Sequence, residues 1–159
     1  MNKARKEWVE ALRSGKYKQG TGTLHTKLPD DSEEFCCLGV ACDLFYPKCD
    51  VIKVENENSD MVSYDGQGGT LPIAIAKHLG FETTGNRFQN LIVKIESGIY
   101  KGSSVGITIL NDNGMTFGQL AQIIENDLVV PEDLIESVIE IINKSGPQDD
   151  FELNKTFEL

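Results

Sequence analysis

The sequence predicts an α+β fold, with about four helices packed on one small, mainly antiparallel sheet. Apolar residues recur at helical spacing near the start and in the last third of the chain, whereas short runs of branched residues lie between turn formers in the middle. Helices that pack on a small, mainly antiparallel sheet form an α+β fold.

The chain has the length of one domain. At 159 residues it should bury roughly 70% of the surface that the unfolded chain exposes, which is enough for one hydrophobic core. We expect one globular domain over residues 1–145. Residues 146–159 carry four acidic side chains and little apolar pattern, so they are predicted to form a mobile acidic tail.

The first half should begin with a helix over residues 3–14, because its apolar residues share one face and Gly15 stands where a left-handed stop would be. Three glycines then lead into a strand within 21–28, and PDDSEE is typical of a turn. The apolar stretch at 35–46 is predicted to be a buried helix entered by a short strand.

The middle of the chain should form a hairpin and a short helix. Branched apolar residues predict strands over 50–55 and 61–64, separated by the polar ENENSD. Pro72 at the first position and Gly80 after the end predict a helix over 72–79.

The last part is predicted in less detail. Residues 88–95 suggest a further strand of the same sheet, and 101–114 fit either a short helix or an extended arm. Thr116 is a suitable N-cap for a helix with apolar residues at i, i+3, i+4 and i+7, and Pro131 should start the last helix.

Composition limits the class of protein. The net charge of −10 argues against general binding to nucleic acid or anionic membranes. No apolar run is long enough for a membrane helix or a signal peptide, so we expect a cytoplasmic protein. The four cysteines should then be free thiols packed in the core; a zinc site completed by His25 or His78 is the disfavoured alternative, because no C-x-x-C pair occurs.

Charge is divided along the chain. Residues 1–28 carry a net charge of +5, and the remaining residues carry −15. The basic part includes a glycine-rich segment, residues 13–27, which we call the arm. Gly15 and Gly20 have the spacing of a phosphate loop, but the Lys and Ser/Thr that should follow are absent and a helix precedes the arm where a strand is needed.

A looser anion site in the arm is the sharper hypothesis, because glycines expose backbone N–H groups while lysines supply charge. The residues predicted to bind such a ligand are Arg13, Lys16, Tyr17, Lys18, Gln19, Gly20, Gly22, His25 and Lys27. The alternative interpretation is a surface segment whose cations are solvated or pair with the chain's own acids.

Three stretches together resemble a family of small uncharacterised proteins encoded by bacteriophages and prophages. They are LRSGKYKQGTGTL at 12–24, FCCLGVACDLF at 35–45 and LNDNGMTFGQLAQIIEN at 110–126, and residues 86–104 are an insertion relative to the usual pattern. The resemblance implies a viral origin and a host cytoplasm as the place of action, but no activity.

We therefore expect a binding protein without a cofactor, not an enzyme, which captures an anionic, nucleotide-derived molecule with the arm to counter host defence. A second hypothesis is an acidic protein-binding inhibitor or nucleic-acid mimic that acts on a host enzyme, since the acidic body would steer association with a basic partner. A hydrolase or transferase that uses His25 or His78 is the third, although neither histidine lies in a recognisable catalytic motif. A homo-oligomer is compatible with all three.

Overall fold

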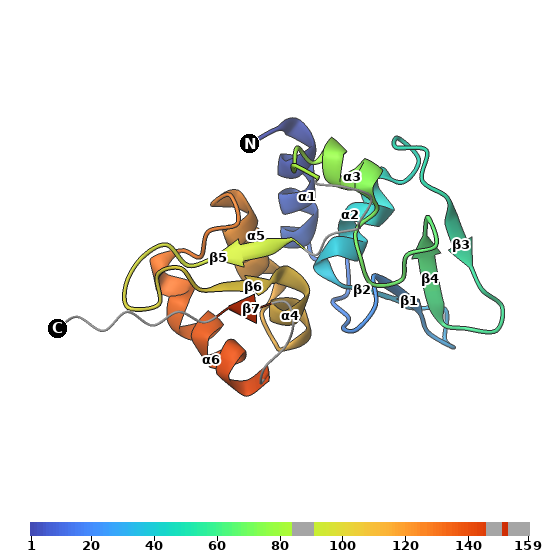
Figure 1. Ribbon diagram of the computed structural model, residues 1–159. Helices are drawn as coiled ribbons and strands as arrows, with labels where there is room; N and C mark the ends of the chain where they lie inside the picture. The colour runs from blue at the N-terminus through green and yellow to red at the C-terminus, as the bar shows by residue number, and fades with distance from the viewer. Residues whose placement is uncertain (84–90, 146–150, 153–159) are drawn as a thin grey trace.

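The structure is a computed structural model that describes residues 1–83, 91–145 and 151–152 (Figure 1). Its α-helices are α1 (Lys3–Arg13), α2 (Cys37–Phe45), α3 (Ile73–His78), α4 (Ile107–Asp112), α5 (Phe117–Glu125) and α6 (Ile135–Ser145), with a 3-10 turn, η1 (Glu132–Leu134), before α6. Its strands are β1 (His25–Lys27), β2 (Glu33–Phe35), β3 (Lys53–Glu55), β4 (Met61–Tyr64), β5 (Ile92–Lys94), β6 (Ser104–Gly106) and β7 (Phe151–Glu152). The predicted α+β class is confirmed.

Four strands from the first half form one antiparallel sheet in the order β2-β1-β4-β3. In its register His25 of β1 lies opposite Phe35 of β2 on one side and Val62 of β4 on the other. The strands predicted within 21–28 and 50–55 are present in shorter form, and the strand predicted at 61–64 has the predicted bounds. Gln19 adds a parallel bridge to Phe35, so the arm runs along the β2 edge, and β3 is the opposite edge.

The prediction of one sheet is wrong, because β5 does not join the first four strands. It pairs with β6, whose other side pairs with β7, in a second sheet on the far side of the molecule (Figure 1). The segment 101–114 is both of the predicted alternatives in succession: β6 ends at Gly106 and α4 begins at Ile107. Residues 88–90 of the predicted strand lie outside the described residues, as does most of the predicted tail.

Helix ends follow the sequence signals closely. Asn2 caps α1 by accepting a hydrogen bond from the backbone N–H of Arg5, and Gly15 has the predicted left-handed conformation, with a φ of 75°. Thr116 caps α5 and forms a capping box with Gln119. Pro72 and Pro131 each stand one residue before a helical segment, not inside it, and Pro131 precedes η1.

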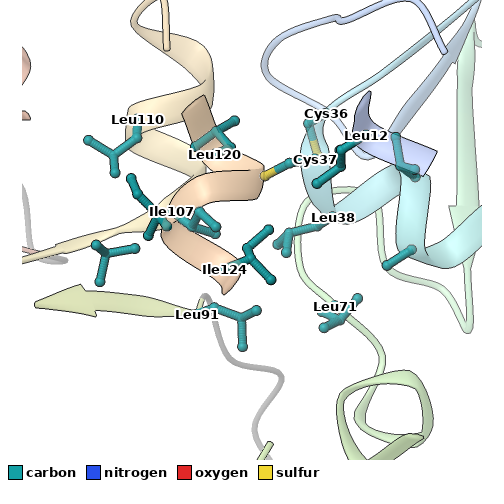
Figure 2. Packing of buried hydrophobic residues seen from close by; sticks show 14 of the residues in the cluster. Leu12, Cys36, Cys37, Leu38, Leu71, Leu91, Ile107, Leu110, Leu120 and Ile124 are labelled. Carbon is teal, nitrogen blue, oxygen red and sulfur yellow. The ribbon is translucent and has the colours of Figure 1, made fainter. Parts of the chain in front are cut away.

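One continuous apolar core joins the two sheets. Helix α1 packs along α5 and α2, and α2 also contacts α3 and α4. Figure 2 shows Leu38 of α2 and Ile124 of α5 facing each other, and Leu12 of α1 belongs to the same core. Trp8 is fully buried, and its indole N–H donates to the carbonyl oxygen of Cys37 over 2.9 Å. The two halves of the chain are therefore held together by helix packing.

Within the residues that the structure describes, no helix is both long enough and apolar enough to cross a bilayer.

Candidate functional site

The arm is the site that the sequence predicts, and the structure pairs most of its cations with acids of the same chain. Arg13 lies 2.6 Å from Glu125, Lys18 lies 3.1 Å from Glu34, and Lys27 lies 3.5 Å from Glu55. Such exposed pairs stabilise the fold by about 1 kcal/mol or less each, but they neutralise the charge that an anion would need.

Lys16 is the exception within the arm. Its side chain is exposed and has no ion pair among the described residues. The N–H groups of two arm glycines are engaged: Gly20 donates to the carbonyl oxygen of Phe35, and Gly22 donates to the carboxylate of Asp112. The structure thus leaves Lys16 as the arm cation without an ion pair, and it turns these two glycine amides toward the protein.

Tyr17 and Gln19 of the arm point into the protein. The Tyr17 hydroxyl donates to Asp43 over 2.7 Å, and burial, together with this carboxylate, raises the pKa of Tyr17. The amide of Gln19 donates to the carbonyl oxygen of Met115 and accepts from the N–H of Phe117. Both side chains are anchors of the arm and do not form a stacking face for a ligand.

Asn111, which sequence reasoning missed, connects the three motif stretches, because its side chain forms hydrogen bonds with residues of the other two. It is 1% exposed, and its Oδ1 accepts from the Gln19 amide over 3.0 Å and from the backbone N–H of Cys37 over 3.2 Å. Its Nδ2 donates to the carbonyl oxygen of Gly20. The LND motif at 110–112 therefore has a structural role; the signal that could have found it is a buried asparagine in an otherwise apolar helix.

His25 lies between two polar partners in the core. Its Nδ1 is 2.9 Å from the hydroxyl of Tyr64, its Nε2 is 3.0 Å from Glu33, and its ring stacks on Phe35 at 4.1 Å. Such a carboxylate–imidazole–phenol chain could relay a proton. However, His25 and Tyr64 are both fully buried, so no substrate can reach either ring without opening the sheet.

Burial lowers the pKa of His25 from its ordinary value of 6.5, and Lys53 adds to this, while Glu33 opposes it. Because the unfolded chain then binds a proton that the folded chain does not, we expect the free energy of unfolding to decrease as the pH falls below about 6.5. Urea denaturation at pH values on either side of this point, for the parent and His25→Gln, measures the effect. The variant should lose the pH dependence, while the control His78→Gln keeps it; an unchanged dependence in His25→Gln would contradict the assignment.

Three of the four cysteines lie in the core, whereas His78 is exposed at the end of α3. Cys36, Cys37 and Cys42 are buried free thiols, as predicted, and Cys49 is half-buried. Burial raises the pKa of Cys36 to about 11, which disfavours the thiolate that metals and electrophiles require. The ring of His78 packs edge-on against Phe45, 4.9 Å away. The described part of the chain brings no three His, Cys, Asp or Glu side chains together for a metal.

A different surface stands out on the first sheet. Val54 of β3 lies opposite Ser63 of β4, so Val54, Ser63 and Met61 point to the same face, and Ile52 continues the alternation before β3. Ile52, Val54 and Met61 are 67%, 48% and 40% exposed. On the opposite face Val62 and Tyr64 are buried. We call the surface formed by Ile52, Val54 and Met61 the open sheet face.

The open sheet face lies in an acidic part of the chain. Residues 50–65 carry five acids, Asp50, Glu55, Glu57, Asp60 and Asp65, against the single Lys53. Lys53 and Glu55 both point to the other face, where Lys53 lies 3.9 Å from Asp43 and Glu55 lies 3.5 Å from Lys27. At the loop end of the same hairpin, Glu57 and Asp60 line a cleft of about 200 Å³ together with Lys27. The hairpin that carries the open sheet face therefore has an excess of acids.

Comparison with known proteins adds a family but no activity. Residues 1–128 match the model of a family described as "Domain of unknown function (DUF8296)". The match includes the arm, the first sheet and α5, and it ends before η1 and α6. No curated protein and no solved structure matches the chain.

Proposed function

We propose that the chain, which belongs to the DUF8296 family, is a binding protein that docks a basic protein segment on its open sheet face. The observation that carries the proposal is the placement of Ile52, Val54 and Met61, which are all exposed on an edge hairpin that carries an excess of acids. Clustered exposed apolar side chains with a polar rim are typical of interaction surfaces.

The edge strand supports the same function. Among the described residues, no strand pairs with the outer side of β3, whereas the arm runs along β2 at the opposite edge. An extended partner segment can add to such an edge through main-chain hydrogen bonds, and its alternate side chains then meet the flanking surface. Its apolar residues would cover Ile52 and Val54, and its cations would meet the acidic rim.

Charge selects the class of partner. A second copy of this chain would bring the acids of one hairpin against those of the other, at a net charge of −10 for each molecule. A basic partner gains attraction at the same positions, and this attraction mainly accelerates association. If the chain has the viral origin that its motifs imply, the partner is a host protein, and the acidic surface acts as an inhibitor of it.

Selection of peptides from a displayed random library tests the proposal without a known partner. We expect the enriched peptides to combine Lys or Arg with apolar residues and to be eluted by salt. Enrichment of neutral or acidic peptides, or no enrichment above a bare support, would contradict it.

Substitution of the exposed apolar side chains should weaken binding of an enriched peptide. For Ile52→Ser with Val54→Ser we expect a Kd at least about tenfold higher, because burial of one aliphatic side chain contributes about 1.5–3 kcal/mol and about 1.4 kcal/mol corresponds to a factor of ten. Ile92→Ser with Ile99→Ser is the matched control, since these side chains are 39% and 48% exposed outside the first sheet. Calorimetric titration should give the control the affinity of the parent; an equal loss in both variants would contradict the placement.

The capture of an anion by the arm remains a separate prediction. The specific observation in its favour is Lys16, the arm cation left without an ion pair in the described chain.

A further inference from the structure

The second sheet carries a cleft that the proposed function does not use. It measures about 510 Å³ and is lined by residues 94–96, at the end of β5, and residues 101–104, which lead into β6. Sites for small molecules generally measure about 300–1,000 Å³, so the cleft has the size of a ligand site.

The charge of this cleft is opposite to that of the whole chain. Lys94 and Lys101 both line it, and Glu96 is the one acid in its lining, although the protein carries −10 overall. Neither lysine forms an ion pair with any described residue, in contrast to Lys18, Lys27 and Lys53, which all do. Both lysines are exposed residues.

The backbone around the cleft is fixed by its own hydrogen bonds. Ile95 donates its N–H to the carbonyl oxygen of Ser103 over 2.9 Å, and Gly102 donates to the carbonyl oxygen of Ile95 over 2.8 Å. The carbonyl oxygen of Lys94 accepts from Val130, which ties the strand to the segment after α5. The two lysines therefore extend from a braced hairpin, which reduces the entropy lost when a ligand binds.

We propose that this cleft binds a small phosphate monoester that also carries hydroxyl groups, such as a sugar phosphate or a nucleoside monophosphate. Lys94 and Lys101 would hold the phosphate by charge-assisted hydrogen bonds. Glu96 would repel a bare anion but can accept hydrogen bonds from the ligand's hydroxyl groups. The hydroxyl of Ser104, which lines the same cleft, can donate to the phosphate or accept from a hydroxyl.

Calorimetric titration of the full chain with ribose 5-phosphate, adenosine monophosphate, inorganic phosphate and free ribose tests the proposal. We expect both esters to bind at least about tenfold more tightly than inorganic phosphate. Free ribose should show no binding at a concentration of about 1 mM, at which even a weak site with a Kd of about 1 mM would be half occupied. Affinity should decrease as salt is added, because exposed charges are screened. The proposal would be overturned if neither ester gave a binding heat, or if free ribose bound as tightly as ribose 5-phosphate.

Matched variants locate the site. Lys94→Gln with Lys101→Gln should weaken ester binding at least about tenfold, a factor that corresponds to about 1.4 kcal/mol. Lys77→Gln in α3, outside both the cleft and the arm, should leave it unchanged, and circular dichroism should show both proteins folded, since the three lysines are exposed. Loss of binding in Lys16→Gln alone would place the anion on the arm and overturn the assignment to this cleft, as would unchanged binding in the double variant.

Glu96→Ala distinguishes recognition of the ligand's phosphate from recognition of its hydroxyl groups. We expect this variant to bind inorganic phosphate more tightly, because a like charge is removed, and to lose the preference for ribose 5-phosphate over inorganic phosphate. A preference that survives in Glu96→Ala would overturn the role of the ligand's hydroxyl groups. None of these variants alters the open sheet face, so failure here leaves the peptide-binding experiment unaffected.

Discussion

Gly39→Ala should destabilise the protein by at least about 3 kcal/mol, the largest effect expected of any single methyl group in this chain. A Cβ on Gly39 in α2 would overlap the carbonyl oxygen of Leu24, a backbone atom that cannot swing aside. That oxygen also accepts a hydrogen bond from the backbone N–H of Cys36, which further restricts its movement. Thermal denaturation should show a loss of roughly 6–12 °C in Tm for a domain of this size.

Gly118→Ala is the matched control for this substitution. Gly118 lies in α5, where an added Cβ would come no nearer than 3.9 Å to the side chain of Thr116. Because alanine favours a helix over glycine by about 1 kcal/mol, this variant should be slightly more stable than the parent. If Gly39→Ala melts within about 2 °C of the parent, a difference below 1 kcal/mol, the close approach of α2 to the Leu24 carbonyl is wrong.

Asn111→Ala should destabilise the protein by about 3 kcal/mol, because each buried polar group left without a partner costs about 1–3 kcal/mol. The substitution removes the acceptor for the Gln19 amide and for the backbone N–H of Cys37, and the donor to the Gly20 carbonyl. Urea denaturation measures the loss, and the arm should lose amide-exchange protection in the same variant.

Asn113→Ala provides the comparison at the end of the same helix. Asn113 is exposed, and its amide makes one hydrogen bond, to the carbonyl oxygen of Ile109. We expect a loss of about 1 kcal/mol or less. Equal destabilisation by the two substitutions would contradict this account. It would show that Asn111 is an ordinary helix-end residue, whose hydrogen bonds to the other two motif stretches add no stability.

Local features of the fold could be predicted from the sequence because their causes lie within a few residues. The side chain of Thr116 caps α5 by accepting from the backbone N–H of Gln119 three residues later, and the stop at Gly15 depends on its own φ. The branched apolar residues on either side of the polar ENENSD likewise predicted the β3–β4 hairpin. In each case the interacting groups are close in sequence.

The features that could not be predicted depend on contacts between distant residues. Gln19 and Asn111 are separated by 92 positions, and nothing in either motif indicates that the two amides meet. The pairing of β5 with β6, and not with the first sheet, is likewise a choice of partner that strand propensity leaves open.

The arm shows the same limit at the level of function. Its cations were visible in the sequence, but their partners were not, since Arg13 pairs with Glu125 across 112 positions. The exposure of individual side chains could not be predicted from the sequence either. Val54 and Val62 are both valines in strands, yet Val54 is 48% exposed and Val62 is 1% exposed. The sequence indicated an acidic body, and the structure adds the apolar surface that a protein partner could bind.

Amide chemical shifts of the isotopically labelled chain, recorded during titration with an enriched basic peptide, test the proposed docking surface most directly. We predict that the largest shifts fall on residues 52–63, which span the open sheet face and its acidic loop, and that these shifts disappear in Ile52→Ser with Val54→Ser. Shifts centred on residues 13–27 or 94–104, with 52–63 unaffected, would contradict the account.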